Sequence, residues 1–131
     1  MDYEYVIDSY AWVEYFRGSE EGKAAKEYIE NKNCATPTIV IAELSEKYKR
    51  ENKNFEDDFS FIISRTKITA LNTEIALMAG EKNHENKKTI KNWGMSDSII
   101  LATAKMLNAK VVTGDEHFRN LNAIMITKES K

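Results

Sequence analysis

Residues 3–8, Tyr-Glu-Tyr-Val-Ile-Asp, carry the strongest clue to the architecture of this chain. Aromatic and β-branched residues dominate the run, which becomes apolar toward its end and stops on an acid, so it predicts a short buried strand. A helix should follow at once, because Ser9 can cap a first turn and an apolar helical stripe then extends to Gly18. A strand that leads directly into a helix is typical of a parallel sheet.

The same alternation continues along the chain. Further strands are predicted at residues 34–35, 67–71, 110–113 and 123–126. Helical signals predict helices after Ser19, from Pro37 to about Glu51, through residues 55–63, after Thr73 as a cap, after Ser96, and briefly at 116–119. Strands joined through helices need crossover connections, which cover both faces of a sheet. The predicted fold class is therefore α/β, a three-layer α/β/α arrangement with a parallel sheet of about five strands.

The composition fits one soluble domain over residues 1–131. Hydrophobic residues make up 42% of the chain and charged residues 31%, which excludes an intrinsically disordered protein. The single cysteine, Cys34, excludes an internal disulfide, and no Cys/His spacing suits structural zinc. The chain opens without a signal-like pattern, and its apolar runs are far shorter than the ~20 residues of a membrane span. We therefore expect a cytoplasmic protein that does not contact a membrane.

The formal net charge of −2 argues against a protein that holds nucleic acid by a bulk positive field alone. Two local basic stretches, around Lys47–Lys53 and Lys87–Lys91, have two open interpretations. They are either solvated helix faces or contacts for phosphate groups.

Two predicted strands end on an acid, the first at Asp8 and the fourth at Gly114-Asp115. Ligand sites in open α/β sheets lie beyond the carboxyl ends of the strands, so Asp8 and Asp115 should lie at the same edge. A carboxylate beside a buried strand carries a desolvation cost unless a partner or a cation offsets it. One such aspartate is equally well explained as a helix cap, but two at one edge are harder to explain in that way.

Glu43 and Asp97 are two further acids in unusual positions. Glu43 interrupts the apolar half-helix Thr-Ile-Val-Ile-Ala-Glu-Leu at 38–44, and Asp97 opens the helix that continues as Ile-Ile-Leu-Ala at 99–102. Each has an ordinary alternative, because many helical glutamates are solvated and an acid in a first turn gains roughly 0.3–1 kcal/mol from the helix dipole.

Four carboxylates that met at one sheet edge would repel one another strongly without a counter-ion. Sites made only of oxygen ligands suit hard divalent cations, chiefly Mg²⁺ or Mn²⁺. Such a site can activate water for in-line attack on phosphorus. The hypothesis from the residues alone is therefore a metal-dependent nuclease built on Asp8, Glu43, Asp97 and Asp115.

Four motifs, taken in order, resemble the PIN domain, a nuclease fold related to flap endonucleases. They are Val6-Ile7-Asp8-Ser9 with its aromatic helix, Ile41-Ala42-Glu43-Leu44, the run from Met95-Ser96-Asp97-Ser98 to Ala104, and Val112-Thr113-Gly114-Asp115-Glu116-His117-Phe118. Each motif is weak singly, whereas the ordered set is fairly specific and spans almost the whole chain. The chain length is similar to that of VapC-type toxins, the stand-alone members of the family.

The resemblance implies roles for individual residues. Asp8, Glu43 and Asp97 would be the principal metal-site acids, with Asp115 as a fourth and more variable one, and all four would be catalytic. Ser9 and Thr113 match small hydroxyl positions that orient neighbouring acids, although plain capping and strand-end hydrogen bonds explain them equally well.

The resemblance also implies an activity and partners. The expected reaction is cleavage of single-stranded RNA with Mg²⁺ or Mn²⁺, leaving a 3′-hydroxyl and a 5′-phosphate. The expected partners are a second copy of the chain, as a homodimer, and a cognate antitoxin that inhibits the nuclease.

The chain departs from the pattern at His117, where many toxins of the family carry an acid. We therefore expect His117, like His84, to be a surface or packing histidine. Two other functions stay open: a PIN-like module that binds RNA or protein without catalysis, and a response-regulator-like phosphoacceptor. The second is disfavoured because Asp8 is followed by Ser9 rather than by another acid.

Overall fold

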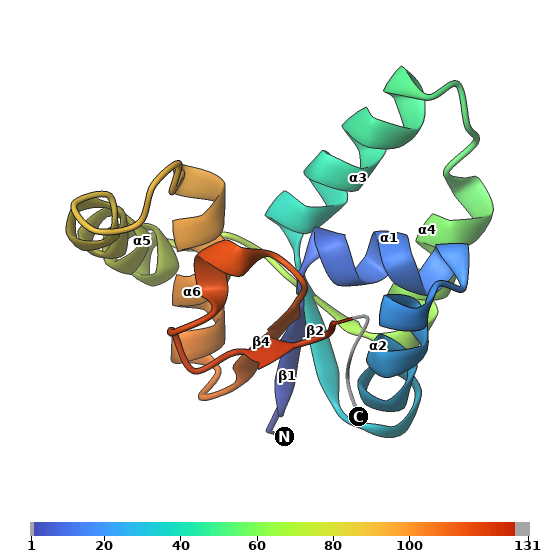
Figure 1. Cartoon of the computed structure of the whole chain (residues 1–131), viewed down its shortest axis with the longest axis horizontal. Coiled ribbons are helices and arrows are strands. Elements are labelled where there is room, and N and C mark those ends of the chain that lie inside the picture. The colour runs from blue at the N-terminus through green and yellow to red at the C-terminus, as the bar shows by residue number, and fades with distance from the viewer. Residues whose placement is uncertain (1, 128–131) are drawn as a thin grey trace.

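The computed structural model describes residues 2–127, which form one five-stranded sheet between two layers of helices (Figure 1). The strands are β1 (Tyr5–Ile7), β2 (Cys34–Pro37), β3 (Lys67–Thr69), β4 (Lys110–Thr113) and β5 (Ile124–Met125). The α-helices are α1 (Ser9–Arg17), α2 (Glu20–Asn31), α3 (Thr38–Arg50), α4 (Glu56–Arg65), α5 (Thr73–Asn86) and α6 (Met95–Met106), and a short 3₁₀ helix, η1 (Glu116–Phe118), joins β4 to β5. The ends of the expected domain, residue 1 and residues 128–131, lie outside the described residues.

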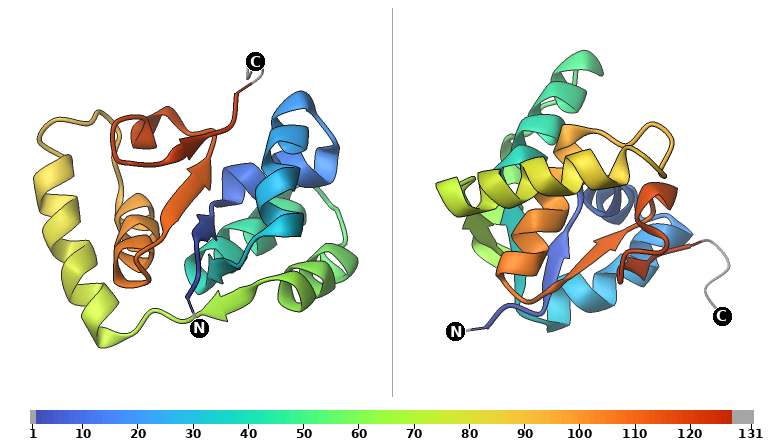
Figure 2. Two further views of the ribbon diagram at one scale, coloured as in Figure 1. Left: turned by 90° about the horizontal axis from the view of Figure 1, so that it is seen from below. Right: turned by 90° about the vertical axis from the view of Figure 1, so that its left-hand side faces the viewer.

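All neighbouring strands are parallel, and their order is β3-β2-β1-β4-β5. Helices α1 to α4 lie on one side of the sheet, and α5 and α6 pack together on the other (Figure 2). The predicted three-layer α/β/α fold with a parallel sheet of about five strands is therefore confirmed. Within the described residues, no helix combines the length and the apolar character that crossing a membrane requires.

The core explains why the central strands are so apolar. Val6, Ile7, Val111 and Val112 in β1 and β4 are almost completely buried, because helices cover both faces of the sheet. On the α1 side, the Trp12 ring fills the layer and its Nε1 donates to Thr36 Oγ1 at 3.2 Å, so the buried indole keeps a hydrogen bond.

The strand order places a topological switch point between β1 and β4. The chain adds β2 and β3 on one side of β1 and then crosses to add β4 and β5 on the other. Ile7 of β1 pairs with Val112 of β4, so both strands end at the same height in the sheet. A crevice at such a switch point is where open α/β sheets bind ligands.

In three helices the capping residue differs from the prediction by one position. The cap of α1 is Asp8, not Ser9: Asp8 has extended backbone angles and its Oδ1 accepts from the Ser9 backbone N–H at 2.7 Å. Likewise Asn72, not Thr73, caps α5 through its side-chain oxygen. Pro37 is the cap of α3 and not its first helical residue, because Pro37 still belongs to β2. In α1 and α5 a side-chain acceptor one residue earlier is the cap, whereas in α3 the extended backbone of Pro37 moves the first helical residue to Thr38.

Candidate active site

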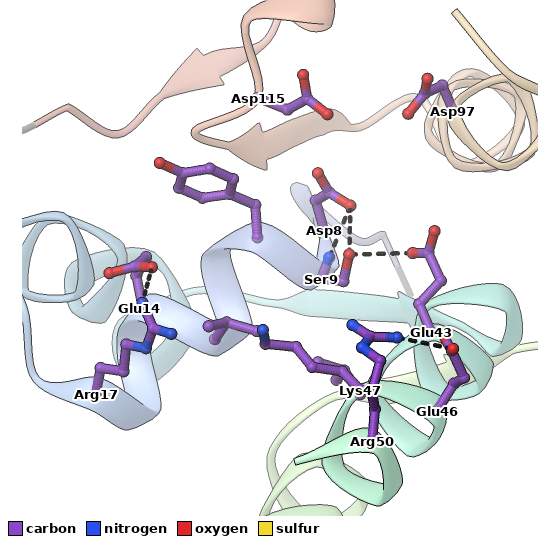
Figure 3. Close-up of a pocket in the computed structure, with 13 residues that line it drawn as sticks. Asp8, Ser9, Glu14, Arg17, Glu43, Glu46, Lys47, Arg50, Asp97 and Asp115 are labelled. Carbon is purple, nitrogen blue, oxygen red and sulfur yellow. Dashed lines mark hydrogen bonds and ion pairs between the residues drawn. The ribbon is translucent and has the colours of Figure 1, made fainter. Parts of the chain in front are cut away.

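The four acids singled out by sequence line one pocket of about 460 Å³ at the switch point (Figure 3). They arrive from four places: Asp8 follows β1, Glu43 lies in α3, Asp97 lies in the first turn of α6, and Asp115 follows β4. In the close-up their carboxylates face a common space rather than pointing apart. The structure thus brings together all four residues, although 107 positions separate the first from the last in the sequence.

Asp8 is the most buried of these acids, with 5% of the residue exposed. Its Oδ1 accepts the Ser9 N–H, and its Oδ2 accepts the Thr113 hydroxyl at 2.7 Å. Burial, together with the negative charges of Glu43 and Asp115, raises the pKa of Asp8 from 3.8 to about 7 against the lowering effect of those hydrogen bonds. Two donors without a positive charge, the Ser9 N–H and the Thr113 hydroxyl, hold this carboxyl group in place.

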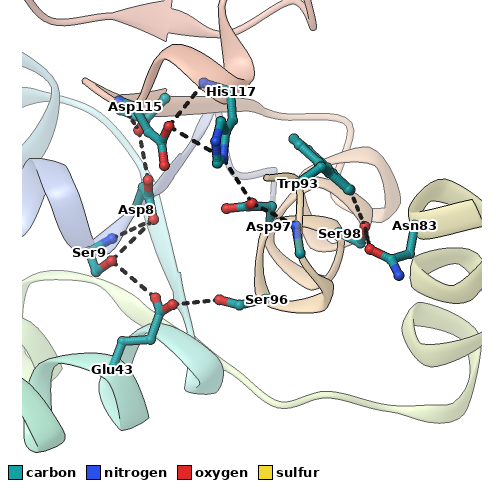
Figure 4. A network of polar contacts seen from close by, with 12 residues as sticks. Asp8, Ser9, Glu43, Asn83, Trp93, Ser96, Asp97, Ser98, Asp115 and His117 are labelled. Atoms are coloured by element: carbon teal, nitrogen blue, oxygen red, sulfur yellow. Dashed lines mark hydrogen bonds and ion pairs between the residues drawn. The ribbon is translucent and has the colours of Figure 1, made fainter. Parts of the chain in front are cut away.

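Two serine hydroxyls fix Glu43. Ser9 Oγ donates to its Oε1 at 3.0 Å, and Ser96 Oγ donates to its Oε2 at 2.5 Å (Figure 4). Ser96 thereby links α6 to α3 across the pocket. The sequence marked Ser96 only as a residue at a helix start, and the one signal of a further role was its place beside Asp97.

Asp97 is held by backbone and by a side chain that sequence reasoning left out of the site. Its Oδ2 accepts the Gly94 backbone N–H at 3.1 Å and lies 3.1 Å from Nδ1 of His117. Burial raises the pKa of Asp97, and the two contacts to Oδ2 work in the opposite direction. The same oxygen makes both contacts, so the other carboxylate oxygen is left to face Asp8 and Asp115 (Figure 4).

Asp115 is tied to Asp8 by a relay through Thr113. The Asp115 backbone N–H donates to Thr113 Oγ1 at 2.9 Å, and that hydroxyl in turn donates to Asp8. The Asp115 carboxylate caps η1 by accepting the backbone N–H of His117 at 2.9 Å. Thr113 and Ser9 therefore each contact an acid, as expected for orienting hydroxyls, while their part in any reaction stays a prediction.

His117 is not the surface or packing histidine that the sequence led us to expect. Its Nδ1 lies 3.1 Å from Asp97 Oδ2 and 3.6 Å from Asp115 Oδ1, between the two carboxylates (Figure 4). This contact could not be predicted from the sequence, because 20 residues separate His117 from Asp97. The two meet because His117 follows β4 and Asp97 lies in the first turn of α6. His84 is exposed on α5, as expected.

The donor set fits a divalent cation. Among residues 2–127, no lysine or arginine forms an ion pair with any of the four acids. The nearest basic groups in the pocket wall, Arg17, Lys47 and Arg50, pair with glutamates of their own helices or helix ends. Crowded carboxylates that no lysine or arginine of the described residues pairs with, two of them with raised pKa values, form an oxygen-rich site of the kind that hard cations occupy.

Solved structures share this fold. A chain of a toxin–antitoxin complex from Klebsiella pneumoniae superposes with a TM-score of 0.76 at 22% identity, covering 98% of this chain and 100% of that one. A chain of VapBC2 from Rickettsia felis, crystallised with a DNA fragment of its promoter, gives 0.72 at 22% identity over 92% and 96%. VapC20 of Mycobacterium tuberculosis, described as a toxin that cleaves the sarcin–ricin loop, gives 0.72 at 11% identity over 95% and 100%. At these identities the likeness establishes the fold.

Comparison by sequence gives the family. No curated protein matches the chain significantly. The model of the PIN domain, however, matches residues 5–124. This range includes strands β1 to β4, the first residue of β5 and all four pocket acids. PIN domains are typically metal-dependent nucleases. The chain belongs to the PIN domain family.

Proposed function

We propose that this protein, as a single nuclease domain over residues 1–131, is a divalent-metal-dependent endoribonuclease that hydrolyses phosphodiester bonds in single-stranded RNA. The observation that carries the proposal is the convergence of Asp8, Glu43, Asp97 and Asp115 in one pocket at the carboxyl edge of the sheet, where within residues 2–127 no lysine or arginine pairs with them. Without a cation, such crowding is unfavourable.

The four acids would hold Mg²⁺ or Mn²⁺ and would be the catalytic residues. A bound cation of this kind would lower the pKa of water and stabilise the negative charge that develops on phosphate oxygens. The chain's own part is orientation: Thr113 fixes Asp8, and Ser9 with Ser96 fixes Glu43. Neutral hydroxyls suit this task, because they donate hydrogen bonds while leaving each carboxylate its negative charge.

The pocket also offers a place for the sugar–phosphate backbone. Its outer wall carries Arg17, Lys47 and Arg50, whose side chains are between 28% and 58% exposed. Exposed ion pairs within a helix are weak and can exchange their partner for a phosphate. These three residues are our candidates for phosphate contacts beside the acids.

We further propose that the protein is the toxin of a toxin–antitoxin pair, that it forms a homodimer, and that a cognate antitoxin inhibits it. Support comes from the structural relatives, several of which crystallised as toxin–antitoxin complexes and some with DNA. RNA as the substrate class is supported by the description of VapC20 as a toxin that cleaves the sarcin–ricin loop.

The test is cleavage of a labelled single-stranded RNA by the purified protein with Mg²⁺ or Mn²⁺, with a chelator control. Asp97→Asn should abolish cation-dependent cleavage while circular dichroism and thermal melting show a folded protein. Asp57→Asn, at an exposed position in the first turn of α4, is the matched control and should cleave normally. Cleavage by folded Asp97→Asn at the wild-type rate would refute the proposal. Binding of RNA without cleavage by the wild type would favour a non-catalytic RNA-binding module.

A further inference from the structure

We propose that His117 joins Asp97 and Asp115 in a mixed nitrogen–oxygen cation site, and that this site selects first-row transition ions over Mg²⁺. The inference rests on the function proposed above, since it names the class of cation for the same pocket. Its subject is His117, which lies beside the pocket acids Asp97 and Asp115 and offers a nitrogen ligand at a position where the family resemblance leads one to expect an acid.

The spacing of the three side chains fits one ion. One ligand atom from each of Asp97, Asp115 and His117 lies within 4.8 Å of the others. Two ligand atoms that are each ~2.1 Å from an ion, at a right angle to one another, lie about 3 Å apart. His117 Nδ1 and Asp97 Oδ2 are 3.1 Å apart, and Nδ1 is 3.6 Å from Asp115 Oδ1. The three groups can therefore share an ion with small side-chain adjustments.

The imidazole is held from behind by packing. Trp93, which is 3% exposed, has its ring centroid 6.3 Å from that of His117. The indole is itself fixed, because its Nε1 donates to Ser98 Oγ at 2.6 Å and Ser98 donates to Asn83 at 3.1 Å (Figure 4). A ring placed by a buried support of this kind loses little freedom when it binds an ion.

The site is also reachable from solvent. The side chains of His117, Asp97 and Asp115 are 27%, 18% and 34% exposed. Asp97 and Asp115 line the same pocket as Asp8, and His117 Nδ1 lies 3.1 Å and 3.6 Å from one carboxylate oxygen of each, so an ion that binds between these two acids can also reach the imidazole.

Ligand chemistry gives the selectivity. Mg²⁺ prefers oxygen ligands and retains several waters, whereas imidazole nitrogen suits transition ions, with affinity that rises from Mn²⁺ through Co²⁺ toward Zn²⁺ for a given site. His117 should therefore strengthen binding of Co²⁺ much more than binding of Mg²⁺. An acid at this position would strengthen binding of both.

The experiment measures metal binding without RNA, by calorimetric titration of Co²⁺ and of Mg²⁺ into wild type, His117→Gln and His84→Gln. His84 is the matched control, because it is the other of the two histidines and is exposed on α5. We expect His117→Gln to weaken Co²⁺ binding about tenfold or more while changing Mg²⁺ binding only slightly. His84→Gln should change neither.

A second measurement tests the ligand directly. With Zn²⁺, nitrogen-15 NMR of the two imidazoles should show a large shift for Nδ1 of His117 and none for His84. Equal loss of Co²⁺ and Mg²⁺ affinity in His117→Gln, or an unshifted His117 resonance, would overturn the inference and would mean that His117 only hydrogen-bonds Asp97. Either result leaves the proposed nuclease standing if the wild type still cleaves RNA, so the two failures are distinguishable.

Discussion

The pocket has two halves that the chain builds in different ways. In the first half, Asp8 is 5% exposed, and three neutral hydroxyls, with one backbone N–H to Asp8, hold Asp8 and Glu43. In the second half, the side chains of Asp97 and Asp115 are 18% and 34% exposed, and backbone N–H groups and an imidazole hold them.

The difference in exposure and in hydrogen-bond donors indicates what each half contributes to the site. The hydroxyls of the first half fix carboxyl groups deep in the fold and preserve the charge that a cation would need. The second half is open to solvent and includes a ligand of another chemical type, so it can influence which cation is chosen. Substitutions in each half should separate these two contributions.

The largest expected effect concerns the burial of Asp8. Because the folded pKa of Asp8 is about 7 and its ordinary value is 3.8, the folded state binds this proton more tightly than the unfolded state. In buffer that contains a metal chelator, the free energy of unfolding of the wild type should therefore fall relative to that of Asp8→Asn as pH rises from about 4 to 8. The expected loss is roughly 4 kcal/mol. Urea denaturation at several pH values measures this. The surface variant Asp57→Asn is the control and should follow the wild-type profile. Parallel profiles for the wild type and Asp8→Asn would contradict the prediction.

Cleavage should next distinguish the two halves. Asp8→Asn removes the most buried charge of the site, and we expect cation-dependent cleavage of RNA to fall by at least about 100-fold. Asp115→Asn should lower it by only about tenfold, since this acid is the more exposed one and has His117 beside it. The measurement is the single-turnover rate of RNA cleavage at saturating Mn²⁺ for the wild type and for each of the two variants. Equal losses would show that the halves do not differ in the way proposed.

The hydroxyl relay gives a smaller effect. Thr113→Val keeps the shape of a fully buried residue and removes the donor to Asp8, so cleavage should fall about tenfold. Thr103→Val is the matched control, because Thr103 is equally buried in α6 but donates to the Ile99 carbonyl away from the pocket. If both variants lose the same activity, the effect of Thr113→Val is one of stability alone.

The smallest effect is expected at Ser96. Ser96→Ala removes one of the two donors to Glu43, but Ser9 still holds the other oxygen, so we expect cleavage to fall only about threefold. The double variant Ser9→Ala with Ser96→Ala should lose more than the product of the single effects. Ser64→Ala, at an exposed serine of α4, serves as the control. A simple product would mean that the two hydroxyls act independently of each other.

Local sequence patterns predicted most of the fold and all four pocket acids. Residues 110–113 form β4 as predicted, because two adjacent valines before a glycine leave few alternatives to a buried strand. Asp8 and Asp115 were found because an acid directly after an apolar strand is costly, and parallel strands end at a common edge. Their catalytic and metal-binding roles remain proposals.

The contacts of His117 and Ser96 could not be predicted in this way. Each is an ordinary residue in its local setting, a histidine in a short 3₁₀ helix and a serine in a helix's first turn. What distinguishes them is a partner that lies 20 residues away for His117 and 53 residues away for Ser96. No local period or cap signal encodes such a contact.

The alternation of strands and helices, the parallel sheet and the acids at the strand ends can be predicted from the sequence, because they follow from hydrophobic periodicity and from the chirality and reach of short connections. The folded arrangement alone places the hydroxyls of Ser9, Ser96 and Thr113 against the acids of the first half and the imidazole of His117 against those of the second. Those contacts depend on how α3, α6 and η1 pack around the ends of β1 and β4, and packing is fixed by the whole fold rather than by any one segment.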